Sequence, residues 1–294
     1  MGAERHRRLV RLWDAVATGV LWLAAVLLLF ILAWFITTVL RQGLPGLSWP
    51  FITGKPHPVS AGGGIGPPLF NTFYVTLLSL VLALPVGMGA GIYLALYARP
   101  GRWVDLLRLG VQALASVPSI VLGLFGLVVF SQAMGFGFSI LSGSLALAIL
   151  NLPLIVNVTE QSLRDLPATY RDASLALGAT PYQTLVRVLL PAALPALVNG
   201  ITLAAGRAAG ETAVLVYTAG VSTSRRLFDF NPLAPGGTLA VYLWGIKANP
   251  IVPDWQQIAN RSAAVLLLVV LAINGLLLGP VRLWYRRFSG RGPH

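Results

Sequence analysis

Long stretches without a charged residue place the strongest limit on how this chain can fold. Charge-free runs of 26, 28, 51 and 20 residues cover 15–40, 71–98, 109–159 and 262–281. Only 10% of all residues are charged, whereas soluble domains carry about 25%. Because about 20 apolar residues in a helix cross the hydrocarbon core of a bilayer, we expect an all-α membrane protein.

These runs predict six membrane-spanning helices in a single transmembrane domain, 1–294. The 51-residue run is long enough for two spans, and we place the break between them at "SQAMGFGFSILSG", 131–143. A cytoplasmic loop at 162–191 follows the fourth span. The predicted spans lie near 15–39, 72–97, 109–130, 143–161, 193–219 and 262–281.

Basic residues are concentrated in alternate segments between these spans. With a cytoplasmic N-terminus, 14 of the 21 arginines and lysines lie in cytoplasmic segments, six lie outside, and Arg207 lies within a span. Because basic residues favour the cytoplasmic side, we expect both termini in the cytoplasm. The arginines flank spans and form no single soluble face, so the net charge of +12 does not indicate nucleic-acid binding.

Several kinds of site lack support in the sequence. The chain has no cysteine, and its three histidines, His6, His57 and His294, are isolated from one another. The glycine-rich "GGGIGPP" at 62–68 is not followed by the lysine and serine or threonine of a nucleotide-binding loop. A serine elbow and a paired-carboxylate site are also missing. We therefore predict no metal, no cofactor, no ATP site and no enzymatic activity in this chain.

The loop between the fourth and fifth spans contains signals for two short helices. Asp165 is expected to cap the first helix, with Pro167 in its first turn. Gly178 is expected to end that helix in the left-handed conformation. Thr180 and Gln183 then have the spacing of a capping box for the second helix.

One face of the first loop helix is suited to contact with a partner. Tyr170, Ala173, Ser174 and Leu177 have the spacing i, i+3, i+4 and i+7. The residue pattern alone supports equally well a lid that covers the cytoplasmic end of the helix bundle.

The same loop resembles the signature of ABC-importer permeases. In that family Glu-Ala-Ala, three residues, Gly and nine further residues precede Ile-x-Leu-Pro, and here "DASLALG" precedes "VLLP" by nine residues. Asp172 and Ser174 retain the acid and a small side chain, and Val188 replaces the isoleucine. The family's loop docks into a groove of a cytoplasmic ATPase. The resemblance implies that coupling residues here are Pro167, Tyr170, Arg171, Asp172, Ala173, Ser174, Leu177 and Gly178.

Four further segments resemble the phosphate branch of these permeases, the PstA type, over about residues 60 to 280. They are "AGIYLALYA" (90–98), "SVPSIVLGLF" (116–125), "GRAAGETA" (206–213) and "DWQQIA" (254–259). Two positions depart from the branch, since Asn157 replaces an arginine and Leu96 replaces an acidic residue.

This resemblance implies a MetI-like permease core in a bacterial plasma (inner) membrane. The implied partners are a homologous second permease subunit, two cytoplasmic ATPase subunits, and an extracytoplasmic phosphate-binding protein that delivers phosphate. Membrane lipid surrounds the spans, and ATP hydrolysis belongs to the partner subunits.

Arg207 and Glu211 are the only charged residues in the apolar stretch 188–224. A charge at the centre of a span costs about 2.5–3.5 kcal/mol on the insertion scale, so both residues are expected to face protein or water. Projected on one helix, Asn199, Arg207, Glu211 and Thr218 share a half, and we predict that they line a translocation path.

A packing role is the alternative for this stretch. Gly206 and Gly210 have the spacing that allows close approach of a neighbouring helix, and the two charges could form an intrahelical ion pair. Arginine before glutamate is the weaker order for such a pair, which favours the path.

Three other functions remain open at this stage. A permease for sulfate, molybdate or an amino acid would share the loop signature without needing Arg207. An ion-driven secondary transporter or channel would need no ATPase. A membrane enzyme would need a set of reactive residues that the sequence does not offer.

Overall fold

A computed structural model describes residues 2–57, 59–222, 224 and 226–288, with side chains described between Trp13 and Gly279. Every regular element in these ranges is helical. The elements are α1 (Gly2–Gly43), α2 (Trp49–Thr53), α3 (Gly66–Ile92), the π-helical turn η1 (Tyr93–Tyr97), α4 (Arg102–Ser116), α5 (Ser119–Gly126), the π-helical η2 (Leu127–Ala133), α6 (Ile140–Arg164), α7 (Ala168–Ala176), α8 (Pro181–Thr184), the π-helical η3 (Leu185–Leu189), α9 (Leu190–Gly210), α10 (Ala213–Thr218), α11 (Leu239–Ala248) and α12 (Trp255–Phe288).

The predicted fold class is confirmed, because the described chain has five helices long and apolar enough to cross a membrane, or six when one bent pair is counted as a span. The predicted break at 131–143 also holds, since η2 ends at Ala133 and α6 begins at Ile140. Gly135 and Gly137 in this connection have φ of 73° and 61°, values that glycine adopts at little cost.

The span predicted near 109–130 is broken in the structure. The chain here forms α4 and then α5 with η2, at 97° to each other. Val117 between them has extended backbone, with ψ of 127°. Its neighbour Pro118 explains the bend, because proline disfavours helical geometry in the residue before it.

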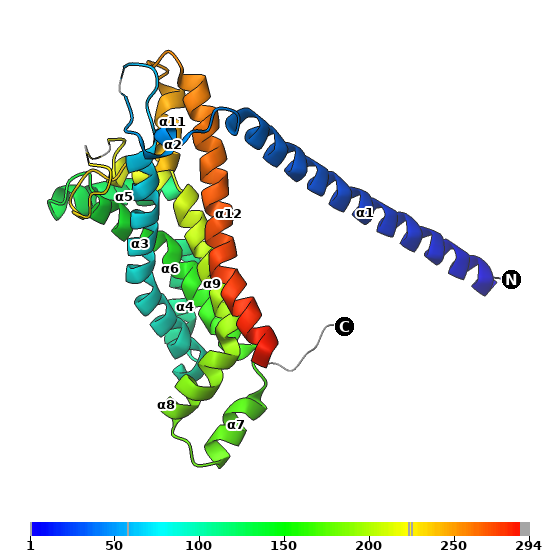
Figure 1. Ribbon diagram of the computed structural model, residues 1–294. Helices are drawn as coiled ribbons and strands as arrows, with labels where there is room; N and C mark the ends of the chain where they lie inside the picture. Colours follow the sequence, from blue (N-terminus) through cyan, green and yellow to red (C-terminus); the bar gives the residue numbers. More distant parts are fainter. Residues whose placement is uncertain (1, 58, 223, 225, 289–294) are drawn as a thin grey trace.

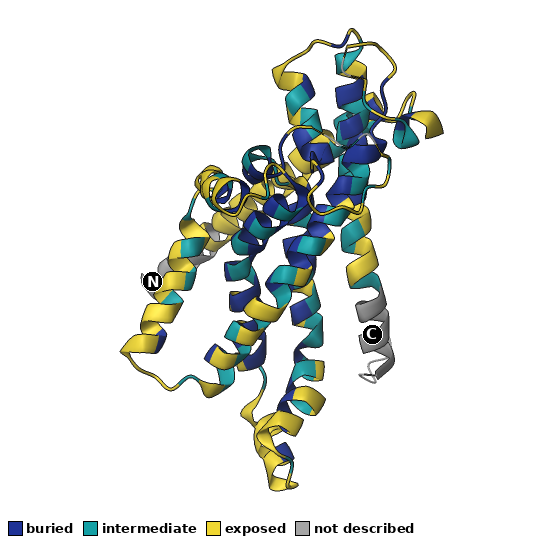
Figure 2. Ribbon diagram, turned by 90° about the vertical axis from the view of Figure 1, so that its left-hand side faces the viewer, coloured by how far each residue is buried: buried dark blue, intermediate teal, exposed yellow. Residues whose placement is uncertain are grey.

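The core is centred on α6, which packs against α3, α4, α5, α9 and α10. Two thirds of its most apolar window, 67%, is buried inside the chain. Leu147 of α6 and Leu215 of α10 are fully buried. Figure 2 shows the buried residues along the helices at the middle of the body, whereas the helices protruding at one end are mostly exposed.

The two ends of the molecule differ in character (Figure 1). At one end lie α2, α11 and the loops around them, and at the other α7 and α8 protrude below the long helices. The ten-residue apolar helix α11 packs against α12 and α3. It lies between the predicted fifth and sixth spans, and its ten residues are too few to cross a membrane.

Helix α1 projects away from the rest of the body (Figure 1). Its contact with the body is at its C-terminal end, where Gly43 lies so close to Asn260 of α12 that a Cβ would be 2.3 Å from the Asn260 carbonyl oxygen. From Trp13 to Phe35 its large apolar side chains are exposed.

Candidate functional site

One face of α9 is exposed and carries the arginine that the sequence singled out. Asn199, Leu203, Arg207 and Gly210 recur at helical spacing and are all exposed, while Ala204 and Ala208 beside them are buried. In the described part of the chain, no carboxylate lies within ion-pair distance of the Arg207 guanidinium.

The predicted unbroken helix over 193–219 is wrong, and with it the expected reach between Arg207 and Glu211. Helix α9 ends at Gly210, and Glu211 has extended backbone with ψ of 130°. The i, i+4 geometry therefore does not apply to the two charges. Glu211 is half-buried at the break between α9 and α10.

Packing of α5 against α10 accounts for this break. A Cβ on Gly123 of α5 would lie 3.0 Å from the Ala213 carbonyl oxygen and from the Val214 Cα. The two backbones are thus in close contact at the first turn of α10. Because α5 comes from a distant part of the sequence, a helical projection of the fifth span could not include this contact.

The predicted place of Thr218 on the open face is also wrong. Thr218 is fully buried, and its hydroxyl donates a hydrogen bond to the Val214 carbonyl at 2.8 Å. Its methyl group would be 2.6 Å from a Cβ on Gly126. After the break, α10 turns into the core and removes Thr218 from the face that carries Arg207.

The two glycines of the predicted packing pair have different surroundings. Gly206 faces Asn274 and Val270 of α12, at 3.4 Å and 3.8 Å from its Cβ position. Gly210 has no atom within 4 Å of its Cβ position among the described residues. Of these two glycines, only Gly206 lies at a helix-helix contact in the described part of the chain.

The short helix α7 forms in the loop after α6, as predicted, but the second predicted loop helix is not separate, because α8 continues through η3 into α9 as the start of the fifth span. Gly178 has φ of 83°, and the amide of Ala179 donates to the Ser174 carbonyl at 3.2 Å, which closes the end of α7. The capping box of Thr180 and Gln183 is present at the start of α8.

The start of α7 differs from the prediction. Asp165 is at the end of α6, where its amide donates to the Gln161 carbonyl, and Pro167 is the N-cap of α7 without a side-chain cap. The fourth span continues to Arg164, further than predicted. Asp165 is therefore the C-cap of α6 and does not cap the start of α7.

The predicted contact face of α7 borders a groove of about 470 Å³. Tyr170, Ala173, Ser174 and Leu177 line it, together with the first residues beyond the helix. The Ser174 hydroxyl lies 2.9 Å from that of Thr184, which ties α7 to α8. Leu177 is 90% exposed at the tip of the loop, and Arg171 and Asp172 are exposed beside it.

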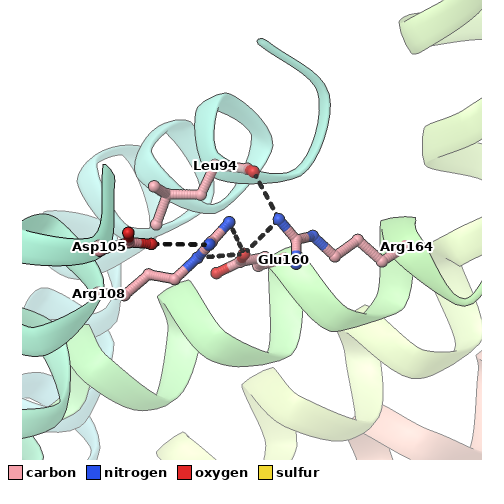
Figure 3. A network of polar contacts seen from close by, with 5 residues as sticks. All are labelled: Leu94, Asp105, Arg108, Glu160 and Arg164. Atoms are coloured by element: carbon pink, nitrogen blue, oxygen red, sulfur yellow. Dashed lines mark hydrogen bonds and ion pairs between the residues drawn. The ribbon is translucent and has the colours of Figure 1, made fainter. Parts of the chain in front are cut away.

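Two arginines converge on one glutamate where α6 approaches this loop (Figure 3). Glu160 Oε1 accepts from Arg108 of α4 at 3.1 Å and forms an ion pair with Arg164 at 3.0 Å. Arg164 also donates to the Leu94 carbonyl in η1 at 3.2 Å. The Glu160 side chain is 12% exposed, and Asp105 lies at the edge of the cluster, 3.9 Å from Arg108.

Sequence reasoning did not identify this cluster. One signal for it is the order Glu160 before Arg164 at i, i+4, the favourable order for a pair on one helix. The Arg108 contact joins residues 52 positions apart, so only the packing of α4 on α6 reveals it. The cluster joins α4, η1 and α6 directly before α7.

Comparison with protein families places most of the chain within one of them. Residues 87–288 match the model of the binding-protein-dependent transport system inner membrane component.

Several relatives align over nearly their whole length. The probable ABC transporter permease protein YqgI of Bacillus subtilis is 39% identical over 90% of this chain and 93% of its own. The phosphate transport system permease protein PstA of Haemophilus influenzae is 32% identical over 87% of this chain and 89% of its own. A probable PstA of Methanocaldococcus jannaschii is 31% identical over 93% and 95%.

Solved ABC transporters share the fold. A chain of the inward-facing MetNI methionine transporter covers 73% of this chain and 93% of its own, at 24% identity and a TM-score of 0.60. A chain of a bacterial alginate transporter, in complex with an alginate-bound periplasmic protein, covers 92% and 96% at 15% identity and a TM-score of 0.60.

Proposed function

This chain belongs to the family of binding-protein-dependent transport system inner membrane components, and on that premise we propose that it is the permease subunit of an ATP-driven phosphate importer. The phosphate transport permeases among its relatives support the substrate, because they align with it over more than four fifths of its length.

The exposed guanidinium of Arg207 carries this proposal. Arg207 lies in the last turn of the membrane-length helix α9. Because a charge that faces hydrocarbon is costly, we expect water or protein to cover this face of α9 in the membrane. No carboxylate among the described residues neutralises the guanidinium. A fixed positive charge in a water-filled path attracts a phosphate anion.

Glu211 has a different part in this proposal. Glu211 is not part of the exposed face of α9, because the helix ends at Gly210. It lies directly after Gly210, in the break before α10. There its negative charge limits how tightly an anion can bind at Arg207, and conduction needs binding weak enough for release. Asn199 extends the path, whereas buried Thr218 supports α10 from within.

The assembly follows from the family. One permease domain, residues 1–294, pairs with a homologous second permease in a bacterial plasma membrane, with both termini in the cytoplasm. Two cytoplasmic ATPases hydrolyse ATP and engage α7 and α8 at the groove beside Leu177, and an extracytoplasmic binding protein delivers phosphate to the opposite end.

Uptake of radiolabelled phosphate by the assembled, reconstituted complex tests the role of Arg207. Replacing Arg207→Gln removes a charge-assisted hydrogen bond of about 1.5–3 kcal/mol, so we expect uptake to fall roughly ten- to hundredfold. Arg207→Lys keeps the positive charge and should retain part of the phosphate uptake that Arg207→Gln loses.

The matched control is Arg99→Gln, an exposed arginine in the turn between η1 and α4, which should leave uptake unchanged. Normal phosphate uptake by Arg207→Gln would contradict the proposed path. Selective uptake of sulfate, molybdate or an amino acid by the unaltered complex would replace phosphate as the substrate, and uptake without ATP would indicate a secondary transporter.

A further inference from the structure

An open cleft of about 340 Å³ lies between α6 and α9, and of its lining residues only Asn199 has been given a role above. Its polar lining includes Asn157 and Gln161 of α6 and Asn199 of α9. At about 30 Å³ per water molecule, it has room for an oxyanion together with several waters.

The three amides of this cleft are available for a ligand. All three side chains are exposed, and none forms a hydrogen bond with another residue in the described ranges. The polar side chains beside them bond to their own helices instead, Ser162 to the Val158 carbonyl and Thr202 to the Val198 carbonyl. Polar groups facing lipid without partners are costly, so these amides indicate contact with water or a solute.

Close packing of α6 on α9 brings the amides together. A Cβ on Gly200 would lie 2.4 Å from Val158 Cγ1, so only glycine permits this approach. The amides at 157 and 161 and the one at 199 therefore line the same cleft.

The cleft continues the exposed face that carries Arg207. Leu203 lines the cleft and lies one turn before Arg207 on that face. Eight residues separate Asn199 from Arg207, which corresponds to about 12 Å along a helix at 1.5 Å per residue. A solute leaving Arg207 toward the α7 end of the molecule meets the amides next.

We propose that Asn157, Gln161 and Asn199 form a second phosphate site, one without a basic residue, on the path inward from Arg207. This inference rests on the proposed function and adds a site to it. Amides suit hydrogen phosphate because each supplies N–H donors for the anionic oxygens and a carbonyl acceptor for the P–OH group. Without a positive charge the site binds weakly, as a station along a path must.

Asp165 also lines the cleft, from the C-terminal end of α6. Its carboxylate and the partial negative charge at that helix end lower the affinity of the cleft for an anion, so phosphate binds there only weakly.

Uptake assays on amide variants of the assembled complex test the site. Replacing Gln161→Leu or Asn199→Leu should each lower phosphate uptake roughly fivefold, as expected from the loss of one hydrogen bond. Gln132→Leu, at an exposed glutamine that does not line the cleft, is the matched control and should transport normally.

A gain of binding separates this site from a structural role. Asn157→Arg adds a charge-assisted contact, so equilibrium binding of radiolabelled phosphate to the purified complex without ATP should tighten roughly tenfold. A mere disturbance of packing would not tighten binding. Unchanged binding by Asn157→Arg together with normal uptake by the leucine variants would overturn the site.

Arg207→Gln measured in parallel distinguishes the two proposals. If it loses uptake while the amide variants transport normally, only the second site fails. If Arg207→Gln itself transports normally, the proposed path fails. Loss of the second permease from the purified Asn199→Leu complex would identify the cleft as a subunit contact and would also overturn the site.

Discussion

Two exposed residues lie where the proposed function requires contact with phosphate or with a partner subunit. Arg207 is exposed on a membrane-length helix, and Leu177 is 90% exposed at the tip of the loop after α6. The sequence singled out Arg207 because it is a charge in an apolar stretch, and the family resemblance implied the coupling role of the loop residues. It could not predict that Thr218 is buried, because that depends on contact with α5.

Leu177 is predicted to anchor the loop on an ATPase subunit. Leu177→Asp would place a charge in that contact, and burying an unpaired charge is strongly unfavourable. We expect ATPase to be lost from the complex when this chain is affinity-purified from membranes. Leu177→Met, which nearly conserves volume, should retain it. Full retention of ATPase by the aspartate variant would exclude Leu177 from the docking surface.

At the scale of elements, the positions of the apolar helices and the break at 131–143 were predictable, whereas the two breaks inside predicted spans were not. Apolar runs located α3, α6 and α12, because hydrophobic length is a local property. The break at Pro118 had a local signal in its proline, but the 97° bend depends on where α5 packs. The break after Gly210 arises from close contact between α5 and α10, which are distant in sequence.

The Glu160 cluster is predicted to hold α4 and η1 to the end of α6 that leads into α7. Glu160→Gln leaves Arg108 and Arg164 facing each other without the carboxylate between them. Because the glutamate is only 12% exposed, we expect the free energy of unfolding of the purified complex to fall by about 1–3 kcal/mol. Uptake per ATP hydrolysed should fall as well, since the cluster directly precedes the coupling loop.

Asp105→Asn is the control for this cluster. Its carboxylate is 73% exposed and lies 3.9 Å from Arg108, so its removal should change the free energy of unfolding by about 0–1 kcal/mol. Equal effects of the two variants in thermal unfolding would show that Glu160 has no special place in holding these helices.

The whole molecule has the features of one part of a larger assembly. Helix α1 projects from the body with exposed apolar side chains, the α9 face carries an unneutralised arginine, and the helices α7 and α8 protrude at one end (Figure 1). Membrane class and the loop helix α7 were predictable from sequence, and the role of Arg207 stays a prediction. The amide cleft and the glutamate cluster were not, because each joins residues from helices that only the fold brings together.

Thiol accessibility along α9 in the assembled complex tests the central claim most directly, and the chain's lack of cysteine provides a clean background in this subunit. Single cysteines replace Leu203 and Gly210, on the face of Arg207, or the buried Ala204 and Ala208. We predict that a membrane-impermeant thiol reagent modifies the first pair, that phosphate slows this modification, and that the second pair does not react. Absence of modification at 203 and 210, or modification that phosphate does not affect, would contradict a phosphate path along Arg207.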